Sequence, residues 1–293
     1  MARMKIRWLT FEKFHNRRPN SIGSSKIRGR WVWEIWDEAD EYTIGEEFDV
    51  AIFQKVYWID FAKVYKGIKI LDMCDPDWIE GARVVEMINE VDAVTTSTDT
   101  LAEALRQFTQ KPVVCIPDRL RFDYYPIKKR NHIGEGKKAL WFGYSGNQVT
   151  LTQTLDYLYD NGYELTVYSD VPFSTNKTFN IRINNIKSEE ENYEQALQSL
   201  ARQHDIVLNP KLNTTKFRYK SNNKSLLAWS MGLPVVDEDP EDLKRYKDPM
   251  ERNKEIEKRQ KELKEKFDVS LSIKQYQDII SELKGAAKII TNS

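Results

Sequence analysis

Residues Asp205 to Val236 read DIVLNPKLNTTKFRYKSNNKSLLAWSMGLPVV and predict a strand, a basic loop, a helix and a second strand. The run DIVLNP stops at Pro210, KSLLAWSM has helical spacing up to Gly232, and LPVV is too short for a helix. The loop has no acid and carries Lys211, Lys216, Arg218, Lys220 and Lys224. Ser221, Asn222 and Asn223 stand where the helix should begin, so capping groups, helix N–H groups and cations together favour an anion such as phosphate. The alternative is a solvated basic loop that only caps the helix.

Composition and length indicate a soluble globular protein with room for two domains. The chain has 293 residues, of which 31% are charged and 40% hydrophobic. It has no apolar run near the roughly 20 residues that span a bilayer, so we expect no membrane span. Cys74 and Cys115 form no CxxC pair and the three histidines are scattered, which predicts a cytoplasmic, reducing location and no metal site.

The zero net charge hides two segments of opposite sign. Residues 1–30 hold nine Lys or Arg against Glu12 alone, whereas residues 31–49 hold eight Asp or Glu and no base. The loop cations Lys26 and Arg28 of the segment 1–30, with Arg119, Arg121, Lys128, Lys129 and Arg130, predict a basic wall. Such a wall suits a phosphorylated acceptor, which could be a nucleic acid or a lipid phosphate.

Strands alternate with helices along most of the chain, so we expect an α/β fold. Residues 1–125 predict one doubly wound, Rossmann-like domain, with a helix over 26–39 and Asp99 capping a later helix. The turn-rich segment 126–137 predicts a linker, and 138–245 a second domain of the same class. Residues 246–293 predict helices that pack back toward the first domain. The carboxyl ends of both sets of strands should face a common cleft.

Two turns in the second domain are candidate ligand sites. WFGYSGNQ follows a strand, and Gly143 and Gly146 would let a phosphate approach the backbone beside Ser145 and Asn147. VYSD ends at Ser169 and Asp170, which could contact a base or ribose. An ordinary turn and an ordinary helix cap are the alternatives for these two segments.

The first domain supplies candidate acceptor groups. LDMCDPDW places Asp72, Asp75 and Asp77 at a strand end, where a carboxylate could take a proton from an acceptor hydroxyl. The same acids could hold Mg²⁺ or merely form a solvated turn. The loop RRPNSIGSSKIRGR would line the acceptor side with Ser21, Gly23, Ser24, Ser25, Lys26 and Arg28. Trp31 could stack on a ligand, but packing is favoured for it and for Trp33 and Trp36.

The order of these parts resembles the GT-B glycosyltransferases, especially the retaining enzymes that use nucleotide sugars. DAVTTSTDTLAEAL followed by KPVVCIPD resembles the end of their first domain, and WFGYSGN the first strand and loop of their second. DIVLNP with KSNNKSLLAWSMGLPVV is similar to their donor-binding strand, helix and G-x-P-V strand. The resemblance covers about residues 67–240.

The resemblance implies transfer of a sugar from a nucleotide-diphosphate sugar, such as a UDP- or GDP-sugar, with no obligatory metal. The implied diphosphate site runs from Gly143 through Tyr144 to Asn147 and along the helix start from Ser221 to Lys224. Lys216, Arg218, Lys220 and Lys224 would stabilise the leaving group, and Asp72, Asp75 or Asp77 would lie near the acceptor hydroxyl.

Small glycosyltransferases of this shape are common in tailed phages. A phage-encoded enzyme would work in the host cytoplasm, and its acceptor could be modified DNA, although polysaccharide and lipid acceptors fit as well. Tyr219 and Leu227 stand where many relatives carry two glutamates. That departure keeps two alternatives open, a non-catalytic binding or virion-associated protein and a nucleotide-sugar epimerase.

Overall fold

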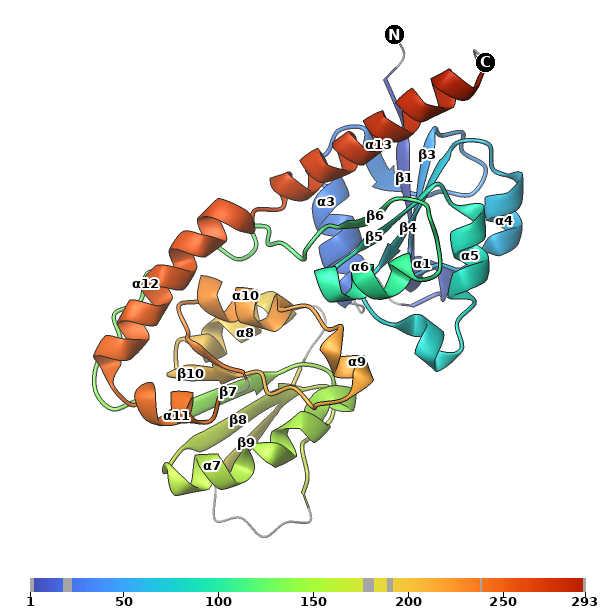
Figure 1. The fold of residues 1–293 in the computed structure, drawn as a ribbon. Helices are drawn as coiled ribbons and strands as arrows, with labels where there is room; N and C mark the ends of the chain where they lie inside the picture. Colours follow the sequence, from blue (N-terminus) through green and yellow to red (C-terminus); the bar gives the residue numbers. More distant parts are fainter. Residues whose placement is uncertain (1–2, 18–22, 176–181, 189–191, 238, 292–293) are drawn as a thin grey trace. The chain divides into compact units, whose positions relative to one another are not determined.

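The computed structural model describes residues 3–17, 23–175, 182–188, 192–237 and 239–291 (Figure 1). Chain contacts divide them into two compact units. The first unit comprises Met1–Arg119, Thr214–Ser221 and Asp268–Ser293, and the second comprises Leu120–Asn213 and Asn222–Phe267. The predicted acceptor residue Ser21 lies outside the described residues.

The first unit is built on a six-stranded parallel sheet in the order β2-β1-β3-β4-β5-β6. Its strands are β1 Ile6–Thr10, β2 Ala39–Glu41, β3 Val50–Gln54, β4 Ile68–Met73, β5 Ala93–Thr96 and β6 Val113–Cys115. Every residue of β3 is buried, as expected for a central parallel strand covered on both faces.

The helices of this unit are short near the start of the chain and long at its end. They are α1 Phe11–Phe14, α2 Gly23–Ser25, the π-helical turn η1 Lys26–Arg30, α3 Trp31–Trp33, α4 Ile59–Val64, the 3₁₀ turn η2 Asp77–Glu80, α5 Val84–Glu90, α6 Asp99–Arg106, α9 Thr215–Arg218 and α13 Ser270–Thr291. The buried sides of α4 and α5 meet the sheet through Ile59, Met87 and Ile88.

Three local predictions for the first unit were wrong. The expected helix over 26–39 stops at Trp33, and the chain then forms the edge strand β2, which pairs with β1. Helix α4 was not predicted, because six residues carry too little periodicity. Thr98, not Asp99, caps α6, since its hydroxyl accepts from the Leu101 N–H. Packing of Trp31 and Trp36 is confirmed, because both are buried.

The second unit has a five-stranded parallel sheet in the order β11-β10-β7-β8-β9. Its strands are β7 Lys138–Phe142, β8 Glu164–Ser169, β9 Ile183–Lys187, β10 Ile206–Leu208 and β11 Val235–Val236. Its helices are η3 Ser145–Gln153, α7 Leu155–Asp160, α8 Tyr193–Ala201, α10 Asn223–Ser230, α11 Glu241–Arg245 and α12 Pro249–Lys266. Two parallel sheets with flanking helices confirm the predicted class of two Rossmann-like units.

The predicted linker 126–137 packs within the second unit. Lys128 N–H donates to Ser230 O at 2.8 Å, and buried His132 donates from Nε2 to Gly232 O at 2.9 Å. Gly232 has φ +80°, and a side chain there would meet Arg130 Cβ at 2.9 Å. Glycine is therefore required where this segment crosses the end of α10.

The C-terminal segment 246–293 divides between the units. α12 belongs to the second, where Gln260 Nε2 donates to Trp229 O at 3.0 Å, and α13 belongs to the first. No helix in the described ranges is long and apolar enough to cross a membrane.

Candidate functional site

Asp72, at the carboxyl end of β4, is fully buried and serves as a structural anion. Arg28 Nη2 lies 2.6 Å from Asp72 Oδ1, and Arg28 Nε donates to Asp72 Oδ2 at 2.9 Å. Thr95 and Tyr276 also donate to Asp72 Oδ1. The prediction that Asp72 takes a proton from an acceptor was wrong, because no acceptor can reach a carboxylate enclosed in this way.

Arg28 was predicted to contact the acceptor, and the structure buries it instead. Its Nη1 donates to Asp118 Oδ1 and to Ile116 O, both at 2.8 Å. Burial works against its charge, but Asp72 and Asp118 outweigh burial and raise the pKa of the Arg28 guanidinium. Ser25 is also buried and donates to Gln54 Oε1 at 2.8 Å. Gly23, Ser24 and Lys26 are half-buried beside them.

Asp75 and Asp77 form a polar cluster with Lys55, whose Nζ lies 2.7 Å from Asp75 Oδ2 and 3.2 Å from Asp77 Oδ1. Lys220 Nζ lies 2.9 Å from Asp75 Oδ1, and Tyr57 OH donates to Asp77 Oδ2 at 2.6 Å. Lys55 has φ +54°, an uncommon backbone conformation for a lysine. No sequence motif singles out Lys55 or Tyr57, apart from their place after the apolar run of β3.

The two carboxyl groups have opposite pKa shifts. Burial would raise the pKa of Asp75, but Lys220 and Lys55 outweigh burial and hold that pKa well below its usual range. Burial also raises the pKa of Asp77, and there its effect is larger than the opposing effects of Lys55 and Tyr57, so the pKa of Asp77 lies above its usual value. The Asp77 carboxylate is therefore the stronger base of the two carboxylates.

The segment Thr214–Ser221 lies in the first unit, against the ends of β4, β5 and β6. Lys216 pairs with Glu80, and Ser221 Oγ donates to Asp118 Oδ2 at 2.6 Å. Carboxylates of this unit therefore engage all three side chains that were predicted to contact the phosphate, Lys216, Lys220 and Ser221. Arg218 is exposed and forms no ion pair with any described residue.

Part of the basic segment 1–30 is neutralised. The basic segment pairs with the acidic segment that follows it, through Arg3–Asp37 at 2.8 Å, Arg7–Glu46 at 2.7 Å, Lys13–Glu41 at 3.1 Å and Arg30–Glu34 at 3.0 Å. Arg119 and Arg121 are buried and bind Ser272 and Asp123. Among the residues of the predicted wall, Lys128 and Lys129 remain exposed.

The glycine turn after β7 brings Gly143 close to Lys224 of α10. The backbone at Gly143 has φ +149°, a conformation that favours glycine. A Cβ atom added to Gly143 would lie 3.7 Å from Lys224 Nζ. Lys224 Nζ also lies 4.3 Å from the centre of the Trp141 ring. Gly146 has open space around it, so its lack of a side chain is not required there.

Asp170 fixes the next residues of the turn. It accepts from Ser145 N–H at 2.7 Å and from Ser145 Oγ at 2.9 Å, while Ser169 Oγ donates to Gly143 O at 2.8 Å. Burial would raise the pKa of Asp170, but these hydrogen bonds outweigh it and lower the pKa. Tyr144 is exposed and Asn147 half-buried. Ser145, Ser169 and Asp170 thus hold the turn in place.

Helix α10 begins beside this turn without a side-chain cap. Asn222 occupies the cap position, and its side chain makes no capping hydrogen bond. The side-chain nitrogen of Asn223 is buried, and within the described part of the chain it has no hydrogen-bond partner. A helix start without a side-chain cap, the helix dipole and a lysine ammonium are features that favour an anion, so the phosphate site stays a prediction here.

Comparison with known proteins identifies the fold. No protein-family profile matches the chain, and no curated protein matches it. A glycosyltransferase from Rickettsia africae ESF-5 matches with TM-score 0.62 and 9% identity, over 97% of this chain and 99% of that one. An alpha-glucosyltransferase in complex with UDP and a 13-mer DNA containing an HMU base matches with TM-score 0.59 and 12% identity, over 80% of each. The chain has the GT-B fold. The DNA-modifying enzyme beta-glucosyltransferase also matches, with TM-score 0.50 and 12% identity, over 97% of this chain and 98% of that one.

The two positions that many GT-B sequences fill with glutamate hold tyrosine and leucine here. The Tyr219 ring lies 5.8 Å from the Trp78 ring, edge to face, and Leu227 is buried in α10. Neither side chain can bind a sugar hydroxyl as a carboxylate would.

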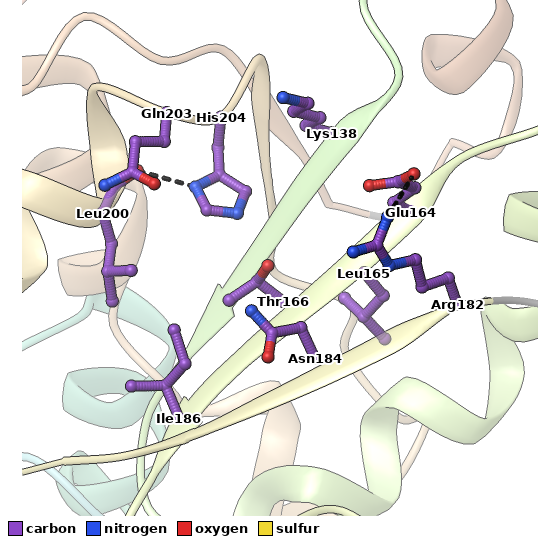
Figure 2. Close-up of a pocket in the computed structure, with 10 residues that line it drawn as sticks. All are labelled: Lys138, Glu164, Leu165, Thr166, Arg182, Asn184, Ile186, Leu200, Gln203 and His204. Carbon is purple, nitrogen blue, oxygen red and sulfur yellow. Dashed lines mark hydrogen bonds and ion pairs between the residues drawn. The ribbon is translucent and has the colours of Figure 1, made fainter.

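A pocket of about 230 Å³ in the second unit was not predicted (Figure 2). Lys138 and Glu164, the first residues of β7 and β8, line it with the end of α8, where His204 Nδ1 donates to Leu200 O at 2.6 Å. Burial lowers the pKa of His204. The pocket lies at the amino ends of the strands, whereas ligands of such sheets bind at the carboxyl ends. The described residues contain no cluster of His, Cys, Asp or Glu that could hold a metal ion.

Proposed function

We propose that this chain is a glycosyltransferase that moves a sugar from a UDP-sugar to a hydroxyl group of DNA. The observation that carries the proposal is the anion site formed by Gly143, Lys224 and the uncapped start of α10. The GT-B fold supports the reaction class, and solved structures of that fold contain UDP or UDP-glucose. We propose UDP rather than GDP on the strength of those structures.

The donor diphosphate would lie against the glycine turn, which lets its oxygens approach the backbone. As the bond from the sugar C1 to the phosphate oxygen breaks, the electron pair stays on the diphosphate. Lys224 and the N–H groups of α10 would stabilise that developing charge. Lys216 and Lys220 have no part in this step, because they pair with Glu80 and Asp75.

The acceptor would bind at the first unit with its hydroxyl near Asp77. The hydroxyl oxygen forms the new bond to the sugar C1, and its proton passes to the Asp77 carboxylate. The raised pKa of Asp77 makes it the better base, whereas Lys55 and Lys220 hold Asp75 in its charged form. Lys55 and Tyr57 would hold the Asp77 carboxylate in position.

DNA is proposed as the acceptor from the structural neighbours. The alpha-glucosyltransferase structures contain DNA with an HMU base or an abasic site, and the beta-glucosyltransferase is described as a DNA-modifying enzyme. The basic N-terminal segment as a whole gives DNA binding less support than its sequence suggested, because the acids that follow it neutralise part of its charge.

Titration calorimetry with UDP tests the donor site. Replacing Lys224 with Ala should weaken UDP binding about tenfold or more, as expected when one charge-assisted contact to phosphate is lost. The matched control is Lys138→Ala, since Lys138 is exposed at the opposite end of β7. Equal UDP affinity in Lys224→Ala and the unchanged chain would overturn the assignment.

A non-catalytic nucleotide-binding role is the second candidate, and the apolar groups at Tyr219 and Leu227 favour it. Hydrolysis of UDP-sugars, with and without DNA, separates the two functions. UDP binding without turnover of any donor, in the presence of DNA, would support the second candidate over the first.

A further inference from the structure

Four aromatic side chains gather on the surface of the first unit, at the carboxyl ends of β1 and β3. We call Phe11, Phe14, His15 and Trp58 the aromatic platform. The Phe14 ring lies 5.3 Å from His15 and 5.8 Å from Trp58, and Phe11 lies 4.2 Å from His15. Phe14 is 46% exposed, and His15 is exposed beside it. Grouped aromatic rings left open to solvent are typical of a surface that binds a partner.

Local structure holds these rings in place. Thr10 caps α1 by accepting from the Lys13 N–H, and the Phe11 N–H donates to Gln54 Oε1 at 3.4 Å. The Phe61 ring stacks on the Trp58 ring, with 4.6 Å between the ring centres and 23° between the ring planes. The platform therefore loses little conformational freedom when a ring packs on it.

The platform adjoins the acid–base cluster through Lys55. Lys55 Nζ lies 5.7 Å from the centre of the Phe11 ring and also pairs with Asp75 and Asp77. A ring held on the platform would thus lie near the carboxylate proposed to accept the proton. Trp31, the tryptophan that the sequence offered for stacking, is buried and cannot do this.

We propose that the aromatic platform stacks an unpaired base of the nucleic-acid acceptor. This inference rests on the proposed function and identifies where that acceptor binds. Base–aromatic stacking next to cationic side chains is the usual way in which proteins hold single-stranded nucleic acid. Arg17, three residues after Phe14, is exposed and forms no ion pair with any described residue, so it can meet a phosphate beside the stacked base.

The charges around the platform favour a nucleic acid over a sugar chain. Arg17 is an exposed cation that follows α1, whereas Lys13 pairs with Glu41 and the half-buried Glu12 stands in the first turn of α1. Asp60 is exposed on the Trp58 side. Among the described residues, the uncompensated positive charge beside the platform is therefore that of Arg17, which suits a phosphate.

Fluorescence anisotropy with a labelled single-stranded dT10 oligonucleotide tests the proposal on the full chain. We expect Phe14→Ala to weaken binding about tenfold, within the range of one lost stacking contact. Phe14→Leu keeps an apolar contact with Trp58 but lacks the π-face, so it should be weakened as well, whereas Phe14→Trp should bind normally. Ile44→Ala removes another exposed apolar side chain, 88% exposed, and should have no effect.

An oligonucleotide of the same length without bases sharpens the test. It should bind the unchanged chain and Phe14→Ala equally, because only the stacked base distinguishes them. Equal dT10 affinity for Phe14→Ala and the unchanged chain would overturn the proposal, as would binding of an oligosaccharide in place of dT10. UDP affinity should stay constant in every Phe14 variant, so that failure of the platform is distinguished from failure of the donor site.

Discussion

Lys220 Nζ lies 2.9 Å from Asp75 Oδ1, and this ion pair joins two residues that are far apart in the chain. Lys220 belongs to a segment that the sequence assigned to donor binding, and Asp75 follows β4 in the first unit. Thr98 Oγ1 donates to the Tyr219 backbone oxygen at 3.3 Å, so the contact extends beyond one pair. The segment Thr214–Ser221 is therefore fixed by the first unit.

Loss of this ion pair should loosen the segment. In Lys220→Ala we expect trypsin to cleave after Lys216 and Arg218 several-fold faster, because a partly exposed ion pair contributes about 1 kcal/mol. Limited proteolysis followed by mass spectrometry measures the rate at each site. Lys211→Ala, outside the segment, serves as the control. Unchanged cleavage in Lys220→Ala would show that the pair does not hold the segment.

The buried pair of Arg28 and Asp72 should dominate the stability of the first unit. Asp72→Asn leaves the buried Arg28 charge short of a partner, and we expect a loss of about 3–5 kcal/mol in the free energy of unfolding. Urea denaturation measures this loss. Asp37→Asn, which breaks a pair whose Asp side chain is 82% exposed, should cost about 1 kcal/mol at most. A stable Asp72→Asn variant that loses only turnover would instead restore Asp72 as a catalytic residue.

Turnover should depend on Asp77 more than on Asp75. Asp77→Asn should lower kcat about 10²–10⁴-fold, the usual effect of removing a general base, without changing UDP affinity. Asp75→Asn should lower it less. The pKa of Asp77 is raised above 3.8, and a general base acts in its deprotonated form. As the pH decreases, kcat should therefore begin to fall while the pH is still above 3.8. A pH profile that is identical in Asp77→Asn and the unchanged chain contradicts the assignment.

His132 should make the second unit sensitive to acid. Burial lowers the pKa of His132 to about 4 from 6.5, so the folded state favours the neutral ring. Between these values the unfolded chain binds more protons, and stability falls as the pH drops from about 6.5 to about 4, by about 3 kcal/mol in all. His132→Gln keeps a donor for Gly232 O but cannot titrate. Denaturation midpoints across this range should fall less in His132→Gln.

Local patterns predicted most of the regular structure. Strands such as Val50–Gln54 and Ile68–Met73 were found because apolar runs bounded by polar turns are a property of neighbouring residues. The glycine turn at Gly143 was found for the same reason. Strand β2, only three residues long and half exposed, was missed because its pairing with β1 is not encoded in its own residues.

The partners of the charged residues could not be predicted. Arg28 was assigned to the acceptor because it stands in a basic loop, yet Asp72 and Asp118 enclose it from elsewhere in the chain. The aromatic platform was missed as well, because Phe14 and Trp58 come together only when β1 and β3 pair.

The sequence by itself determined the parallel α/β architecture, the glycine turn and the helix start that Lys224 follows. These features depend on backbone preferences and on hydrophobic periodicity, both of which act over a few residues. Tertiary structure alone decided which carboxylates are buried, which lysines are neutralised and which aromatic rings face solvent. Burial and electrostatic energy depend on distances through space, and the order of strands in the sheet sets those distances.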